Sequence, residues 1–266
     1  MFDARAEAVN LSTPIESTIR WLRERSPALP LRHRLSWWWV PARCACCGQR
    51  GDLGAIDLCA ACLAEFPFRP PPEAPADPAL PLVAFAYEDP VGSGLRALKY
   101  RGDLRPARLL GTLLAAHAAH AAHAAQSGAP LPQLLVPVPL HPSRLGERGF
   151  NQSEQLARHA AAWLALPVAS HLLRRCRATV PQAGLEAAAR VRNVAGAFVP
   201  APGAANWLAA RRIRRVALLD DVLTTGATVR AAADALQGCG LEDCRIWAVA
   251  QVRGPVGEAP PLEMSE

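Results

Sequence analysis

Two adjacent acids, Asp220 and Asp221, precede a run of small and hydroxyl-bearing residues in the stretch VALLDDVLTTGATV. The apolar residues before the acids are typical of a buried strand, which we expect to end at the acids. Ligands of open α/β sheets gather at the carboxyl ends of the strands. An ionised carboxylate accepts hydrogen bonds from a neighbouring pair of hydroxyl groups, such as the diol of a ribose. The acids therefore predict a sugar-binding edge.

The turn after the acids has the composition of a phosphate site. Thr224 and Thr225 offer hydroxyl donors, and Gly226 lets the backbone approach a ligand. A helix expected from about Ala227, with Thr228 in its first turn, presents unpaired N–H groups. One junction can thus hold both ends of a ribose 5-phosphate. A Walker motif and a dinucleotide fingerprint fit less well, because the lysine and the further glycines are missing; an ordinary strand cap and turn is the alternative for this stretch alone.

Clustered cysteines are the second group that could do chemistry. They form two CxxC pairs with a short loop between them: Cys44 with Cys47, and Cys59 with Cys62. Four thiolates suit tetrahedral zinc, and Gly48 favours the tight turn after the first pair. Cys46 is an extra thiol that could replace a neighbour, and an iron site or redox-active thiols are the alternatives. So small a module cannot bury enough apolar area alone, which predicts a structural role for the metal.

The charge balance is mildly basic. The 266 residues include 29 Lys and Arg against 23 Asp and Glu, a net charge of +6. Anionic partners fit this balance, and both phosphorylated small molecules and nucleic acid qualify. The start MFDARAEAVN lacks the layout of a secretory signal, and WWWV is too short to span a bilayer. We therefore expect a cytoplasmic protein with no membrane span, in which metal binding explains clustered thiols better than disulfides do.

Short apolar runs alternate with helical patterns from residue 82 onward. The expected strands are LVAFAY, LLVPV, RVALL and RIWAVAQV, and the expected helices cover about 104–125, 152–165 and a stretch after 227. Buried strands separated by helices need crossover connections. The sequence therefore predicts a doubly wound α/β fold, in which a parallel sheet carries helices on both faces.

Composition divides the chain into five segments. We expect an N-terminal extension with a short helix PIESTIRWLRER (1–43), a zinc-ribbon module (44–66), a proline-rich linker (67–81), the α/β domain (82–253) and a disordered tail (254–266). PAPGAANWLAAR, from residue 200, is expected to be a loose insertion. The tryptophans at 37–39 are expected to cover apolar surface, with a ligand site as the alternative. The histidines at 117, 120 and 123 are expected to belong to a low-complexity helix, with a metal site as the alternative.

The stretch VALLDDVLTTGATV resembles the signature of the type I phosphoribosyltransferases, whose ligand is phosphoribosyl diphosphate. Three further segments are similar to one branch of that superfamily, the ComF-type competence proteins: ALKYRGD, PVPLHPSRLGERGFNQS and RATVPQAGLEAAARVRNVAGAF. The match covers nearly everything from the cysteine module to AVAQVR, in the family's order. It implies a type I phosphoribosyltransferase fold with a small N-terminal zinc ribbon of four cysteines.

The resemblance also implies roles for individual residues. Ser143 and Arg144 lie in the segment that resembles the diphosphate-binding loop, and Lys99 is a further cation near the strand ends, although a surface turn and surface charges are the alternatives. Residues 174–193 resemble the flexible loop that closes over the substrate. That loop contributes Arg177, Gln182 and Arg190, the phosphate turn contributes Thr224, Thr225, Gly226, Ala227 and Thr228, and the catalytic residues are Asp220 and Asp221.

The chemistry implied by the resemblance is displacement of diphosphate from C1 of the ribose by a nitrogen nucleophile, with magnesium bridging the diphosphate and the ribose hydroxyls. No stretch identifies the acceptor, and turnover does not follow from a ligand site. The family also implies a role in DNA uptake together with other competence proteins. A non-catalytic protein that binds single-stranded DNA is the alternative, and the sequence carries no signal for the oligomeric state.

Overall fold

The computed structural model describes residues 14–25, 43–49, 51, 56–69, 80–124, 130–178 and 193–252. The chain divides into two compact units, Met1–Glu65 and Phe66–Glu266. The first contains α1 (Pro14–Arg25), which confirms the predicted helix, and α3 (Ala60–Ala64). Within α1, Thr18 and Leu22 are buried one turn apart, on one helix face. The tryptophans at 37–39 and the tail at 254–266 lie outside the described residues.

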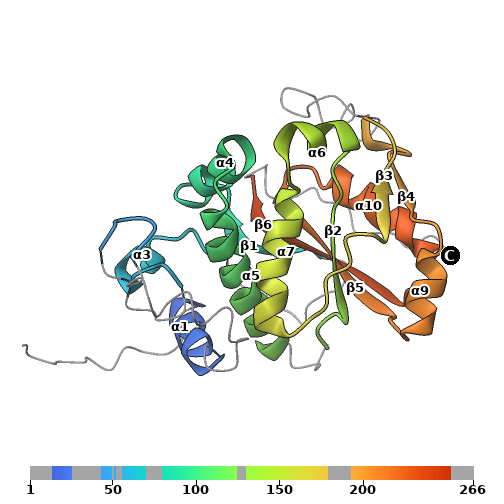
Figure 1. The fold of residues 1–266 in the computed structure, drawn as a ribbon. Coiled ribbons are helices and arrows are strands. Elements are labelled where there is room, and N and C mark those ends of the chain that lie inside the picture. The colour runs from blue at the N-terminus through green and yellow to red at the C-terminus, as the bar shows by residue number, and fades with distance from the viewer. Residues whose placement is uncertain are drawn as a thin grey trace, which may run out of the picture. The chain divides into compact units, whose positions relative to one another are not determined.

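The second unit is built on a parallel sheet of four strands (Figure 1). Their order is β1 (Leu82–Ala86), β6 (Asp243–Gln251), β5 (Arg215–Leu223) and β2 (Leu134–Pro137). Each neighbouring pair is parallel. All four strands contain the apolar runs expected from the sequence, and helices connect them. The structure thus confirms the predicted α/β class.

Helices cover both faces of the sheet. Side chains at alternate strand positions, such as Val136, Leu218 and Ile246, form a core cluster with α10 (Ala227–Gln237). The intervening residues, such as Leu135 and Leu219, are also buried. On their side α5 (Arg105–Ala124) packs against α7 (Gln152–Leu164), and both contact the sheet. α4 (Val91–Arg101) precedes α5. None of the described helices has both the length and the apolar character needed to cross a membrane.

A close approach at Gly111 sets the packing of α5 on α7. A Cβ atom at this position would lie 2.6 Å from the backbone oxygen of Leu156 and 2.9 Å from the Cβ of His159. A backbone oxygen in a helix cannot move aside unless the two helices separate. The contact therefore requires glycine.

Gly111→Ala is expected to destabilise the protein by about 3 kcal/mol, the upper end of the usual cost of overpacking. Urea unfolding followed by circular dichroism measures this effect. Gly146→Ala is the matched control, because a Cβ at Gly146 meets nothing within 4 Å; it should be neutral or slightly stabilising. Equal unfolding midpoints for parent and Gly111→Ala would show that the two helices can separate without cost.

A small antiparallel sheet of β3 (Leu173–Arg175) and β4 (Phe198–Pro200) stands apart from the main one. It is followed by α9 (Ala204–Ala210). The prediction that PAPGAANWLAAR is loose was wrong, because Ala204 and Leu208, one turn apart, join the core. The prolines and glycine before α9 mark the start of the helix: Gly203 takes a φ of +79° as its N-cap.

Residues beside the proline-rich segment belong to the second unit. Phe68 forms an antiparallel bridge with Phe85 of β1, and their ring centroids lie 4.8 Å apart. The backbone N–H of Arg69 donates to the carbonyl of Ala84 at 2.9 Å. The division between the units falls between Glu65 and Phe66, and residues 70–79 lie outside the described part.

Candidate functional site

Strand β5 continues past the apolar run that predicted it. Asp220 and Asp221 lie within the strand, not after it, because β6 pairs with β5 as far as Leu223. On the other side, β2 pairs only as far as Leu219, which lies opposite Pro137. The two acids therefore stand where β5 has lost one neighbour but keeps the other. They lie at the carboxyl edge of the sheet, as the sequence predicted.

A pocket of about 130 Å³ opens at this edge. Its walls come from α4, from the loop after β2, from α6 (Pro142–Arg148), and from α7, β3, β5 and α10. The lining residues are Lys99, Val138, Pro139, Leu140, Arg144, Arg148, Gln152, Ser153, Arg175, Asp220, Asp221, Val222 and Thr228. The structure thus brings Lys99, Arg144, Thr228 and the two acids into one pocket.

Asp221 is paired with Lys99 inside the pocket. The Lys99 Nζ lies 3.5 Å from Asp221 Oδ2, and only 7% of the Asp221 side chain is exposed. Among the described residues, no hydrogen-bond donor reaches this buried oxygen. The charge of Asp221 raises the pKa of Lys99. The pocket thus holds a buried carboxylate oxygen with unused acceptor capacity.

Asp220 is held by neutral donors. Its Oδ1 accepts from the Ser153 hydroxyl at 3.0 Å and from the backbone N–H of Asp221 at 2.9 Å. Burial, reinforced by the charge of Asp221, raises the pKa of Asp220 to about 7. The pKa of Asp220 thus lies near neutral pH, above the usual range of a carboxyl.

The start of α7 positions Ser153. Asn151 caps the helix: its Oδ1 accepts from the Ser153 N–H at 3.0 Å, and its Nδ2 donates to the Val138 carbonyl at 3.0 Å. These bonds tie the helix to the chain leaving β2. Arg148 Nη1 donates to Gln152 Oε1 at 2.7 Å. Arg148, Gln152 and Ser153 were not among the residues predicted from the sequence, although an Asn N-cap two residues before a serine in GFNQS was a usable signal.

The small sheet contributes one more cation, from the start of the segment 174–193 that was expected to close over the substrate, although it was not among the predicted site residues. Arg175, the last residue of β3, places its guanidinium carbon 5.3 Å from the centre of the Phe198 ring. Burial lowers the pKa of Arg175, the charge of Arg144 lowers it further, and Asp220 raises it. The position between Arg144 and Asp220 makes Arg175 part of the same charge cluster.

The turn after β5 begins α10 with a glycine in the left-handed region. Gly226 takes a φ of +74° and is the N-cap of α10. The Ala227 N–H donates to Thr225 Oγ1 at 3.4 Å, and the Arg230 guanidinium donates to the Thr225 carbonyl. Thr224 is exposed, and of this turn only Thr228 lines the pocket.

The segment predicted to bind diphosphate forms a short helix, α6. His141 caps it by accepting from the Ser143 N–H at 3.3 Å, and the Ser143 hydroxyl lies 2.8 Å from His141 Nδ1. Arg144 lines the pocket, whereas Ser143 is exposed and does not line it. Of this predicted pair, only the arginine faces the acids.

Arg177 lies outside the pocket lining and binds backbone. Its Nη2 donates to the carbonyls of Asn193 at 3.2 Å and Ala195 at 2.5 Å. These bonds join the two ends of the segment that the sequence analysis expected to close over the substrate. Gln182 and Arg190, predicted in the same segment, lie outside the described residues.

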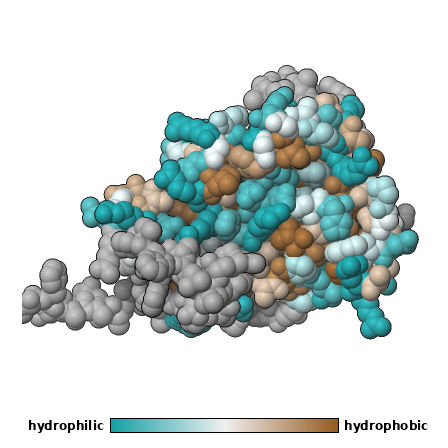
Figure 2. All heavy atoms as spheres, viewed as in Figure 1, coloured by the Kyte–Doolittle hydropathy of each residue, from teal (hydrophilic) through white to brown (hydrophobic). Residues whose placement is uncertain are grey.

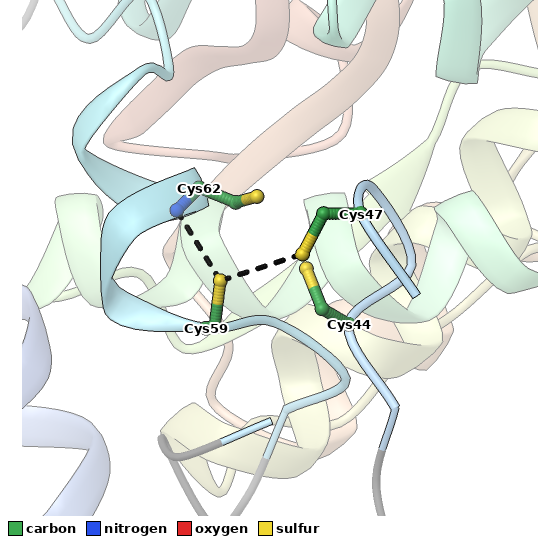
Figure 3. A group of neighbouring side chains, drawn as sticks. All are labelled: Cys44, Cys47, Cys59 and Cys62. Carbon is green, nitrogen blue, oxygen red and sulfur yellow. Dashed lines mark hydrogen bonds between the residues drawn. The ribbon is translucent and has the colours of Figure 1, made fainter. Parts of the chain in front are cut away.

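The four predicted cysteine ligands lie together in the first unit (Figure 3). The Sγ atoms of Cys44, Cys47, Cys59 and Cys62 all lie within 4.8 Å of one another. Cys47 Sγ and Cys59 Sγ are 3.8 Å apart, which matches the edge of a tetrahedron with bonds of about 2.3 Å to zinc. Gly48 takes a φ of +72° after the first pair, as expected. Among the described residues, these four cysteines form the cluster of metal-ligating side chains that could hold a metal ion.

The electrostatics of the cluster favour a thiolate. Burial raises the pKa of Cys44, but hydrogen bonds from backbone N–H groups, that of Cys47 above all, outweigh burial and bring this pKa to about 6. A thiolate is the form of cysteine that binds metals. Cys46, the extra thiol, is exposed and is not part of the cluster.

Comparison with known proteins identifies relatives. No family model matches the chain. Competence protein F of Haemophilus influenzae is 31% identical over 165 residues, which cover 62% of this chain and 69% of that protein. The DNA utilization proteins YhgH of Salmonella typhi and Escherichia coli are 33% and 32% identical over 164 residues, or 60% of this chain and 67% of each of theirs. With a parallel sheet and a four-cysteine cluster arranged as the sequence resemblance implied, the chain belongs to the family of competence protein F.

Proposed function

We propose that this protein binds phosphoribosyl diphosphate in the pocket at the carboxyl end of β5 and acts as a phosphoribosyltransferase-like protein in DNA uptake. The observation that supports the ligand most directly is the buried Asp221 Oδ2, which lacks a hydrogen-bond donor among the described residues. A ribose hydroxyl supplies such a donor. The role in DNA uptake rests on the names of the relatives, a competence protein and DNA utilization proteins.

Each polar part of the ligand can be assigned to a group of residues at the site. The ribose diol fits Asp220 and Asp221, and the diphosphate fits the cationic side chains of Lys99, Arg144, Arg148 and Arg175. The 5′-phosphate fits the turn from Thr224 to Thr228, where α10 begins. The pocket of about 130 Å³ is smaller than the roughly 300 Å³ at the low end for small-molecule sites. The ligand would therefore extend from the pocket onto this turn.

The proposed reaction breaks the bond between C1 of the ribose and the diphosphate, and forms a bond from C1 to a nitrogen nucleophile. Asp221 would stabilise the positive charge that develops on the sugar, and the cations would hold the departing diphosphate. Magnesium bound to the diphosphate would shield its charge, and Asp221 Oδ2 is an oxygen of the type it prefers. The nucleophile is to be sought by measuring diphosphate release in a screen of bases, amines and DNA ends.

Calorimetric titration of the full chain with phosphoribosyl diphosphate and magnesium tests the ligand. Asp221→Asn should lower the affinity on the order of 100-fold, because it removes a charged acceptor from a buried site. Arg101→Ala is the control: Arg101 lies two residues after Lys99 on α4 but is exposed and outside the pocket lining. If the parent and Asp221→Asn bind equally well, the proposed site is wrong.

We further propose that the metal of the cysteine cluster is zinc in a structural role. Four thiolates at tetrahedral spacing favour zinc, and they leave no open coordination position for a substrate. An iron centre is the competing occupant. Metal analysis of protein purified without added metal distinguishes the two, with one zinc per chain as the expected content.

A further inference from the structure

Arginines are concentrated at the amino end of β5, away from the pocket. Arg211, Arg212, Arg214 and Arg215 occupy four of the five positions from 211 to 215, and the first three of them are exposed. We call residues 211–214 the arginine turn. It follows α9 and leads into β5, whose acids lie five residues beyond Arg215, or about 17 Å along a strand. Figure 2 shows hydrophilic residues gathered at the lower right, where Figure 1 places α9.

The backbone of the arginine turn is fixed by Gln133, just before β2. Gln133 Oε1 accepts from the N–H groups of Arg214 at 2.9 Å and Arg215 at 3.1 Å. Its Nε2 donates to the carbonyl of Arg212 at 3.2 Å. A surface that is already ordered loses little entropy when a partner binds.

Arg212 has a backbone conformation that arginine rarely adopts. Its φ is +54°, in the left-handed region where a Cβ is disfavoured and glycine is usual. Glycine at this position would relieve the strain. The conformation belongs to the end of α9, where the N–H of Arg212 donates to the carbonyl of Ala209 and that of Ile213 to the carbonyl of Leu208, both at 3.0 Å.

Arg211 is held flat against an aromatic ring. Its guanidinium carbon lies 4.1 Å from the centre of the Trp207 ring, and its Nη1 donates to the Trp207 carbonyl at 3.3 Å. The His171 ring packs against Trp207 at 5.0 Å, nearly perpendicular to it. A guanidinium with one face on a ring can offer its other face to a nucleobase.

Within the described part of the chain, acidic residues do not neutralise this surface. The Glu242 N–H donates to the carbonyl of Arg214, which places Glu242 beside the turn. The next acid, Asp243, is paired with Arg245 at 2.7 Å. Among the contacts of the described residues, Glu242 is thus the one acid beside the four arginines that is not paired with another basic residue. The excess positive charge favours a polyanion as the partner.

We propose that the arginine turn, with Arg211 stacked on Trp207, is a binding surface for single-stranded DNA. Arg212 and Arg214 contact its phosphates, and a base stacks on the guanidinium of Arg211. A single strand is favoured over a duplex because only unpaired bases can expose a face to a side chain. The names of the relatives favour DNA over other polyanions. This surface is separate from the proposed ligand pocket and does not depend on it.

The test is fluorescence anisotropy of a labelled 20-nucleotide oligothymidine with the full chain at several salt concentrations. The triple variant Arg211→Ala, Arg212→Ala, Arg214→Ala should lower the affinity on the order of tenfold or more. The slope of log affinity against log salt concentration should also become shallower by about 1.4, since each of the two lost phosphate contacts removes about 0.7 on a single strand. The triple variant Arg101→Ala, Arg105→Ala, Arg158→Ala removes the same charge from exposed positions elsewhere and should bind like the parent.

Arg212→Gly separates function from folding. It should raise the unfolding temperature by roughly 2 °C because the strain is gone, while weakening DNA binding. Arg212→Lys should retain most of the binding. The proposal is overturned if the parent does not bind the oligonucleotide, if both triple variants lose equal affinity, if Arg212→Gly binds like the parent, or if duplex DNA or phosphatidylglycerol vesicles bind more tightly than the single strand. Asp221→Asn should leave DNA binding intact, so failure of the pocket proposal would not affect this test.

Discussion

Removal of the proposed zinc by a chelator is expected to unfold the cysteine module and to leave the parallel sheet intact. Within residues 43–65 the described apolar side chains that are buried, apart from Cys44, are Ile56, Leu58 and Leu63, too few to stabilise a fold of this size. Zinc bound by four thiolates contributes apparent free energies of about 10–16 kcal/mol in small zinc domains. Hydrogen exchange measured by mass spectrometry should show loss of protection at residues 43–65 and none in β5 or β6.

Two cysteine variants provide a matched comparison for the chelation experiment. Cys59→Ser removes one ligand and should reproduce the effect of the chelator, because three thiolates hold zinc far more weakly than four. Cys46→Ser removes a thiol that is exposed and outside the cluster, so it should retain the metal and the protection. If the two variants exchange alike, or if the chelator leaves residues 43–65 protected, the metal does not stabilise this unit.

Asp220→Asn is expected to make the protein more stable at pH 8 and to have little effect on stability near pH 4. The pKa of Asp220 rises from 3.8 to about 7 in the folded protein, because the carboxyl is buried beside Asp221. Between these values the folded state binds more protons than the unfolded state, so stability falls as the pH rises from about 4 to 7. Asparagine does not ionise and avoids this loss, which is on the order of 4 kcal/mol at most.

Urea unfolding of parent and Asp220→Asn from pH 4 to pH 8.5 measures the difference. Asparagine keeps an oxygen that can accept from the Ser153 hydroxyl, so the comparison changes the charge and preserves this contact. A difference in stability that is the same at every pH would contradict the assignment. We also expect Asp220→Asn to bind phosphoribosyl diphosphate less tightly, a case of stability given up for function.

Local sequence patterns predicted the four strands of the main sheet and the long helices correctly, whereas the strands β3 and β4 were not predicted. The apolar runs before Asp220 and around Trp247 are buried on both faces of the sheet, and such runs are readable without knowledge of their partners. The end of β5 was not readable, because it depends on how far β6 pairs along it. The helix that buries Leu208 was missed because its flanking prolines and Gly203 were taken as signs of a loose loop, although they mark its start.

The candidate site was predicted where one motif carries it and missed where the tertiary fold assembles it. Asp220, Asp221 and Thr228 follow one another in the sequence, so one junction identified them. Arg175 and Ser153 lie on separate elements and enter the pocket only through packing of β3 and α7. Ser143 stays a prediction: it lies in the predicted diphosphate segment, and in the structure its hydroxyl lies beside His141.

β5 carries the two acids near one end and the arginine turn at the other, and its pairing with β6 over its whole length makes it a stiff spacer. A nucleic acid held at the arginines is thereby kept at a fixed offset from any sugar held by the acids. Substitutions at the arginine turn can then change the affinity for nucleic acid without changing the affinity for the sugar, and substitutions at the acids can do the reverse. Family members that lack one of these two binding sites should keep strand β5 and differ only in the residues at the corresponding end of the strand.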